Sequence, residues 1–178
     1  RQCEQLLRDD LRIVVMSATI DTAALAGALR CPVIESEGRM FPVEVIRTED
    51  EASMANVSEL VAKTIVQAHR SHEGDILAFL PGEGEIRRVL ELLDGRLGAT
   101  RIYPLYGLLS NDDQARAIAP SRGGERKVVL ATPIAETSLT IEGVRVVVDS
   151  GLCRKMVFDT RSGLNHLETV RISMDMAI

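Results

Sequence analysis

Residues 127–151 read KVVLATPIAETSLTIEGVRVVVDSG and carry the strongest structural signal in this sequence. The stretch contains two unbroken apolar runs, KVVLA (127–131) and VRVVVD (144–149), which are rich in β-branched residues and predict buried strands. A strand that meets solvent on one face usually alternates apolar and polar residues. The unbroken runs therefore indicate a parallel sheet that is covered on both faces.

The rest of the chain alternates between short β-rich runs and longer helical patterns. We predict strands at 12–16, 75–80 and 101–105, and short extended runs at 32–35 and 42–46. We predict a helix at 21–29, with Asp21 as its N-cap, a long helix at 51–70, and a helix at 111–119, with Asn111 as its N-cap. A further helix is predicted after Pro81-Gly82, with Gly98 as its C-cap. Its apolar face consists of Ile86, Val89, Leu90, Leu93 and Leu97. This order predicts an α/β domain with right-handed crossovers.

The C-terminal part of the sequence predicts a different element. Residues 154–158 and 164–172 flank the polar stretch Asp-Thr-Arg-Ser-Gly. Two β-rich runs around such a stretch are typical of a β-hairpin, with Gly163 near its turn.

The chain is expected to contain parts of two domains. Residues 1–37 carry one predicted strand and pieces of two helices, which is too little to bury a core. We therefore expect 1–37 to be the end of a preceding domain and 38–178 to be the main domain, with the crossing point between Gly38 and Phe41. The absence of an initiator Met fits a piece of a longer protein.

Composition limits the classes of function. Apolar residues make up 46% of the chain and the net charge is −5, so a basic field over the whole surface is excluded. Any nucleic-acid contact must come from a local groove, from hydroxyl groups or from backbone N–H groups. The scattered Cys3, Cys31 and Cys153 suggest reduced thiols and a cytoplasmic protein, and no apolar run is long enough to predict a membrane-spanning helix.

Three predicted strands end in polar segments, where parallel α/β sheets bind ligands. These segments are Ser17-Ala18-Thr19, Pro81 to Glu85, and Thr132 to Glu142. The last segment concentrates hydroxyl groups that can bind phosphates without a large charge, at Thr132, Thr137, Ser138 and Thr140. From spacing alone, a capped surface helix with incidental threonines is an equal alternative.

Other polar clusters favour structural roles. The Pro81–Glu85 loop lacks the Gly-Lys-Ser/Thr ending of a nucleotide-binding loop, and its glutamates suit the N-terminal dipole of a helix. The histidines do not have metal-ligand spacing, so we expect no metal site. Asp149 is expected to form a structural hydrogen bond, and Arg122, Arg126 and Lys127 to form a solvated turn.

Together, these segments resemble the motif series of superfamily 2 helicases. MSATID (16–21) is similar to motif III and ILAFLPGEGEI (76–86) to motif IV. ATPIAETSLTIEGV (131–144), followed by VVVDSG (146–151), is very close to motif V of DEAH-box helicases, with Pro133 where that motif usually has Asn. SEGRMFPVEV (36–45) most resembles the bacterial DEAH-box branch called HrpB.

The resemblance implies a fold and a set of site residues. It implies a RecA-like parallel sheet flanked by helices, of the P-loop NTPase type, with 154–172 as the strand-separating hairpin of the family. Ser17 and Thr19 match the motif that couples the ATP site to strand movement. Ser138, Thr140 and Glu142 match positions near the ribose, and Ile118 matches the position beside adenine. The nucleic-acid-binding residues that it implies are Gly82, Thr132, Thr137, Arg154 and Lys155.

The implied function is that of the second motor domain of an ATP-dependent helicase. The partners would be single-stranded RNA or DNA, and the cofactor ATP with Mg²⁺. The Gly-Lys-Thr phosphate loop, the DEAH box and the arginine-rich motif VI do not occur in this sequence, so we expect these residues alone to have no ATPase activity. A free-standing nucleic-acid-binding module of the same fold is the alternative.

Overall fold

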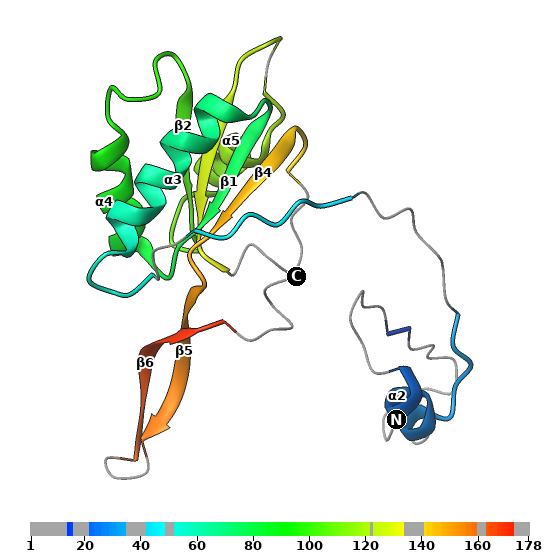
Figure 1. Cartoon of the computed structure of the whole chain (residues 1–178). Helices are drawn as coiled ribbons and strands as arrows, with labels where there is room; N and C mark the ends of the chain where they lie inside the picture. Colours follow the sequence, from blue (N-terminus) through cyan, green and yellow to red (C-terminus); the bar gives the residue numbers. More distant parts are fainter. Residues whose placement is uncertain are drawn as a thin grey trace. The chain divides into compact units, whose positions relative to one another are not determined.

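A parallel sheet of four strands forms the core of one part of the computed structural model (Figure 1). The structure describes residues 14–15, 22–34, 42–48, 52–121, 123–133, 141–159 and 163–172. The chain divides into two units, Arg1–Ile46 and Arg47–Ile178. The first unit contains the helix α2 (Thr22–Leu29), which confirms the helix predicted at 21–29.

The second unit contains the sheet and its helices. The sheet has the order β2-β3-β1-β4, and all its strands are parallel. Its strands are β1 (Asp75–Phe79), β2 (Arg101–Leu105), β3 (Lys127–Ala131) and β4 (Val144–Asp149), and its helices are α3 (Val57–Ser71), α4 (Glu83–Leu93) and α5 (Asn111–Ile118). The predicted α/β class and the four strands of this sheet are confirmed.

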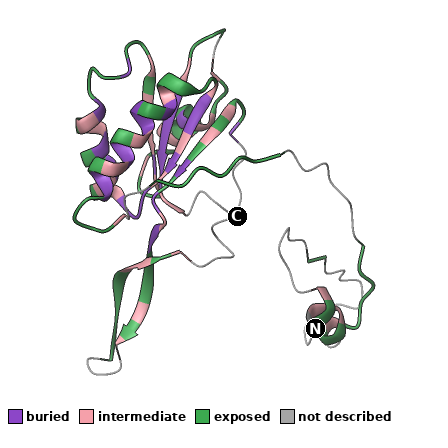
Figure 2. Cartoon of the chain, viewed as in Figure 1, coloured by how far each residue is buried: buried purple, intermediate pink, exposed green. Residues whose placement is uncertain are grey.

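Successive side chains of a strand point to opposite faces of the sheet, so the sheet carries one apolar layer on each face. On one face, Ile76 of β1 and Val128 and Leu130 of β3 pack with α3 and α4. On the other face, Val129 of β3 packs with Ala117 of α5. Figure 2 shows buried residues concentrated in the inner strands and on the helix surfaces that face them.

The prediction of a sheet covered on both faces is wrong for β4. β4 is an edge strand of the sheet, and the exposed fraction of Val147 is 58%. Within the described part of the chain, α5 contacts the β2 side of the sheet. The outward side chains of β4 therefore remain open to solvent among these residues.

Helix boundaries differ from the sequence expectations. α3 begins at Val57 rather than at 51, because Ser53 N donates to Asn56 Oδ1 at 2.7 Å in a turn that precedes the helix. α4 ends at Leu93, before Gly95 adopts a φ of +67°, so Gly98 does not cap it.

The N-cap of α5 also differs from the prediction. Ser110, rather than Asn111, caps the helix, because Ser110 Oγ accepts a hydrogen bond from Asp113 N at 3.2 Å. This is a shift of one residue, and the predicted helix is otherwise confirmed.

Three extended segments of the prediction are not strands where they are described. Only Val14 and Val15 of the predicted strand 12–16 lie inside the described ranges, and they are exposed and irregular. The described residues of the runs at 32–35 and 42–46 also belong to no strand.

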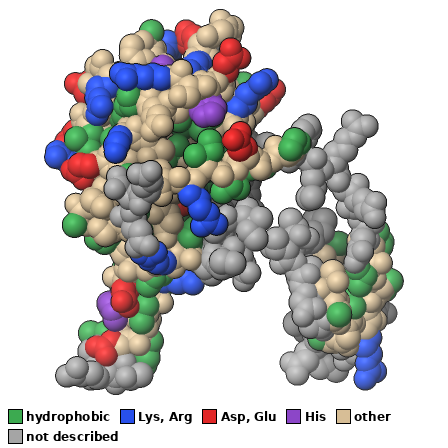
Figure 3. Space-filling model, viewed as in Figure 1, with side chains coloured by type: hydrophobic (Ala, Val, Ile, Leu, Met, Phe, Trp, Pro, Cys, Tyr) green, Lys and Arg blue, Asp and Glu red, His purple; other side chains and the backbone are tan. Residues whose placement is uncertain are grey.

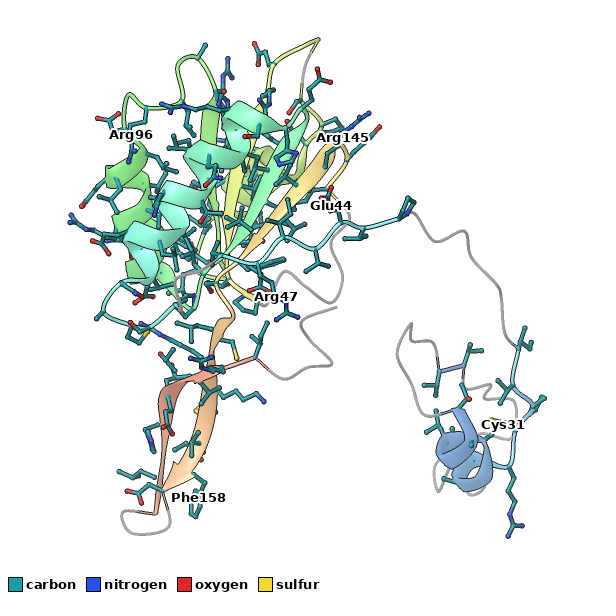
Figure 4. All side chains as sticks on the ribbon, viewed as in Figure 1. Cys31, Glu44, Arg47, Arg96, Arg145 and Phe158 are labelled. Atoms are coloured by element: carbon teal, nitrogen blue, oxygen red, sulfur yellow. The ribbon has the colours of Figure 1, made fainter. Side chains whose placement is uncertain are left out.

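The predicted hairpin is confirmed. β5 (Leu152–Asp159) and β6 (Leu164–Arg171) pair in antiparallel register, and Gly163 has a φ of +69° next to the turn. Figure 1 shows the hairpin leaving the sheet at the carboxyl end of β4, and Figure 4 shows Phe158 near the far end of the hairpin.

Buried charges stabilise the amino ends of the strands. Asp75 Oδ1 accepts from Lys127 N at 2.9 Å, and Asp75 Oδ2 accepts from Ser121 Oγ at 2.7 Å. Lys127 Nζ donates to the carbonyls of Ala117 and Ala119, at 2.9 and 2.6 Å, and so binds the C-terminal end of α5. Burial lowers the pKa of the Lys127 ammonium, against the opposing attraction of Asp75.

The predicted solvated turn is therefore wrong for Lys127, whose exposed fraction is 4%. Arg126 is half-buried, and its Nε and Nη1 donate to the carbonyls of Gly74 and His69 at 2.9 and 3.0 Å. Arg122 lies outside the described residues. The two basic side chains bind carbonyls that become adjacent only in the folded chain.

Candidate functional site

The carboxyl ends of the strands lie together at one end of the sheet. Three backbone hydrogen bonds join the segments that leave it: Leu80 N to Ala131 O at 2.9 Å, Thr132 N to Leu105 O at 3.1 Å, and Ser150 N to Phe79 O at 3.2 Å. Gly82 and Thr132 therefore lie at the same end of the sheet, as their positions after neighbouring strands predicted.

Gly82 is the N-cap residue of α4 and lies directly against the hairpin residue Arg154. Its backbone is extended, with φ −166° and ψ 177°. A Cβ at this position would lie 2.8 Å from Arg154 Cζ, 2.9 Å from Nη1 and 3.0 Å from Nε. The guanidinium thus fills the space that any side chain at residue 82 would need.

Glu85, in the first turn of α4, holds the same guanidinium. Arg154 Nη2 lies 3.4 Å from both Oε1 and Oε2 of Glu85. The exposed fraction is 13% for the Glu85 side chain and 40% for Arg154. The sequence predicts for Glu85 only a favourable place in the helix dipole, and it carries no local signal for this contact.

Lys155, the next candidate on the hairpin, faces away from Arg154, because successive residues of a strand point to opposite faces. The register places Lys155 opposite Glu168 and Arg154 opposite Thr169. The two cations therefore cannot contact one phosphate from the same face of the hairpin.

The structure places Ile118 apart from Gly82 and Thr132. Ile118 is half-buried and packs against the apolar cluster around Val129. It follows Ala117, whose carbonyl binds Lys127 at the start of β3. Ile118 thus lies towards the opposite end of the strands.

The remaining candidate residues divide into two groups. Glu142 is exposed and Thr132 is half-buried. Ser17, Thr19, Thr137, Ser138 and Thr140 lie outside the described residues. The structural role expected for Asp149 is confirmed, because its Oδ1 accepts from Gly151 N at 2.8 Å.

Charge in this unit is mixed rather than segregated. Figure 3 shows Lys and Arg side chains interleaved with Asp and Glu over the visible face of the sheet unit. Among the described residues, no group of three His, Cys, Asp or Glu could hold a metal ion. None of the described helices is long and apolar enough to cross a membrane.

Comparisons with known proteins point to one family. The family described as "Helicase conserved C-terminal domain" matches residues 54–168. The ATP-dependent RNA helicase HrpB of Escherichia coli K12 is 49% identical over 172 residues, which are 96% of this chain and 21% of that protein. The pre-mRNA-splicing factor ATP-dependent RNA helicase prp22 of Schizosaccharomyces pombe is 39% identical over 181 residues, 97% of this chain and 15% of that protein.

Solved structures agree with the sequence comparisons. A crystal structure of the Escherichia coli DEAH/RHA helicase HrpB aligns with a TM-score of 0.86 at 48% identity, over 98% of this chain and 22% of the HrpB chain. A second crystal structure, of the Escherichia coli DExH-box NTPase HrpB, aligns with a TM-score of 0.79 at 47% identity, over 97% of this chain and 22% of that one. The chain thus spans about a fifth of the length of these relatives.

Proposed function

The chain belongs to the helicase conserved C-terminal domain family and is similar to DEAH-box helicases near HrpB, and on that premise we propose that it is the second motor domain of an ATP-dependent RNA helicase. The boundary that we propose between this domain and the end of the preceding RecA-like domain is at residues 37 and 38. Unwinding and ATP hydrolysis belong, in this proposal, to the whole protein.

One observation carries the proposal: the carboxyl end of the sheet brings Gly82, Thr132 and Arg154 to one end of the domain. Thr132 follows β3, Gly82 follows β1, and Arg154 reaches Gly82 from the hairpin. A backbone segment, a hydroxyl group and a guanidinium are suitable donors for the phosphates of a nucleic-acid strand. We propose that Thr137 extends this contact, and that Lys155, on the other face of the hairpin, contacts a different phosphate.

The remaining roles follow from the helicase family. Ser138, Thr140 and Glu142 would lie near the ribose of ATP, and Ile118 near its adenine, where an aliphatic side chain stacks weakly. Ser17 and Thr19 would couple the ATP site to movement of the strand. The described residues do not fit a Mg²⁺ site, so we assign the Mg²⁺ ligands to residues other than these.

The mechanism that we propose is cyclic closure of two RecA-like domains. ATP, when bound between the domains, favours the closed state, and this domain then holds the nucleic-acid backbone. Hydrolysis reopens the cleft and advances the strand. Contacts that depend on hydroxyl and backbone groups suit such a cycle, because they carry little charge to oppose release at each step.

The experiment that tests the proposal is Thr132→Val in the full-length protein. The substitution keeps the shape of the side chain and removes its hydroxyl group, so RNA-stimulated ATPase should fall more than basal ATPase. Thr64→Val on α3 is the matched control, because the Thr64 hydroxyl binds only the Leu60 carbonyl of its own helix, at 2.9 Å. An equal fall in the two activities would show that Thr132 does not contact the nucleic acid.

Parallel assays with RNA and DNA of the same sequence address the substrate, since a preference for RNA requires contacts to the 2′-hydroxyl. The alternative function, a nucleic-acid-binding module without ATPase activity, predicts binding but no turnover by the full-length protein. The 178-residue chain alone should bind weakly and hydrolyse no ATP. We propose a cytoplasmic location, which rests on the similarity to the bacterial helicase HrpB.

A further inference from the structure

The contact between Glu85 and Arg154 joins two parts of the domain that are distant in sequence. Arg154 belongs to the hairpin strand β5, and Glu85 to the first turn of α4. Their ion pair spans 69 positions of the sequence and crosses directly over Gly82. The pair therefore fixes where the guanidinium lies relative to the end of the sheet.

The geometry leaves most donors of Arg154 available. A guanidinium has five N–H donors, and Glu85 binds only the Nη2 group. Nη1 and Nε lie 2.9 and 3.0 Å from the place that a Cβ of residue 82 would take, beside the N-terminus of α4, where the helix dipole also favours an anion. One guanidinium can therefore bind Glu85 and a phosphate at the same time.

Exposure distinguishes the two partners. Arg154 is the more exposed of the pair at 40%, whereas only 13% of the Glu85 side chain meets solvent. A carboxylate with so little exposed surface can orient the guanidinium while it presents little of its own charge to solvent. Arg154 is the group that reaches outward.

We propose that Glu85 is a positioning residue that holds the Arg154 guanidinium across Gly82, so that a free N–H donor, on Nη1 or Nε, binds a backbone phosphate of the nucleic acid. This inference rests on the proposed function. It also assigns a reason to Gly82, because a Cβ at this residue would lie 2.8 Å from Arg154 Cζ and would displace the guanidinium.

The direction in which one substitution changes the binding affinity distinguishes a positioning role of Glu85 from simple repulsion of phosphate. Removing a negative charge near a nucleic-acid surface strengthens binding if the charge only repels phosphate. Glu85→Gln should instead weaken binding, because Arg154 loses its orientation. Glu83→Gln is the matched control, since Glu83 lies in the same helical turn but pairs with Arg87, at 2.5 Å.

The experiment measures binding of a fluorescein-labelled single-stranded RNA to the full-length protein over a series of salt concentrations. Arg154→Ala should weaken binding about tenfold, as expected for a hydrogen bond to a charged group. It should also reduce the slope of log affinity against log salt by about 0.7, the value for one phosphate contact on a single strand. Glu85→Gln should show the same two changes, and Glu83→Gln neither.

A double-mutant cycle completes the test. If Glu85 acts through Arg154, the double variant binds no more weakly than Arg154→Ala alone. Unchanged or tighter binding by Glu85→Gln, or additive losses in the double variant, overturns the positioning role. Wild-type binding by Arg154→Ala instead overturns the place of Arg154 in the proposed interface.

Gly82→Ala gives a second route that does not depend on Glu85. The extended backbone at residue 82 accepts alanine without strain, so the effect arises from the clash with the guanidinium. The substitution should weaken binding in the wild-type background and have no further effect with Arg154→Ala. A further loss in that background contradicts the role assigned to the missing Cβ.

Discussion

Lys127→Met tests whether a buried cation stabilises the amino end of the sheet. The ammonium donates to the carbonyls of Ala119 and Ala117 at 2.6 and 2.9 Å. Methionine retains the apolar stem, so the loss is confined to these two hydrogen bonds and to the attraction between the ammonium and Asp75. Ala117 is fully buried, and its carbonyl would lose its partner, whereas Ala119 is exposed and its carbonyl can bind water.

The magnitude follows from these two carbonyls. A hydrogen bond to a charged group contributes about 1.5–3 kcal/mol, and relief of the burial cost of the ammonium offsets part of the sum. We expect the free energy of unfolding to fall by about 2 kcal/mol. For a protein of this size, that corresponds to a fall in Tm of about 4–8 °C.

The assay is urea unfolding followed by circular dichroism, with the exposed Lys155→Met as a control for the change in charge. A pH series gives a second test. The pKa of Lys127 is lowered from 10.5 in the folded state, so the folded chain releases this proton first and the wild type gains stability as pH rises towards 10.5. The deficit of the Met variant should therefore widen over that range. A Met variant as stable as the wild type, or a deficit that shrinks with pH, would refute the reasoning.

Three further substitutions test the packing and the turns. Leu130→Ala, at a fully buried position of β3, should lower the free energy of unfolding by about 2–5 kcal/mol in urea titrations, and a loss below 1 kcal/mol would contradict its central place. Burial and the nearby arginine charges lower the pKa of His69 from 6.5, so the wild type should lose stability as pH falls through this value. His69→Gln should abolish that loss when melts at pH 5 and 7.5 are compared, and an unchanged difference would exclude His69 as its source. Gly143→Ala should lower Tm, because φ is +91° and the new Cβ would lie 3.0 Å from Asp75 Oδ2; a Tm equal to the wild type would show that the turn relaxes without cost.

The sheet could be predicted from the sequence because the residue pattern that identifies each strand lies within the strand itself. The runs at 75–80, 101–105, 127–131 and 144–149 each contain enough β-branched or aromatic residues to identify a strand without tertiary information. The polar residues after these strands were then predictable as neighbours, since parallel strands end at one side of a sheet. The hydroxyl of Thr132 was singled out in this way, whereas Gly82 was assigned a role only through the resemblance to helicases.

Contacts between distant segments were not predictable. Lys127 follows Arg126 at the start of an apolar run, and its sequence context suggests a solvated side chain, but the end of α5 brings two carbonyls onto its ammonium. Glu85 and Arg154 are 69 positions apart, and their meeting depends on the direction in which the hairpin leaves β4. Such directions are set by packing, not by a pattern in either segment.

The two ends of the sheet differ in how they use charge, and this difference bears on how an acidic chain can bind a polyanion. At the amino ends of the strands, Lys127 and Asp75 are buried and bound to protein groups, which fixes the helices to the sheet. At the carboxyl ends, Arg154 remains 40% exposed and engages its carboxylate partner through a single nitrogen. A net charge of −5 repels a nucleic acid at long range, so binding must depend on short-range donors that are already oriented. The orientation of one guanidinium by Glu85 therefore matters more on this surface than it would on a basic one, where neighbouring cations could replace it.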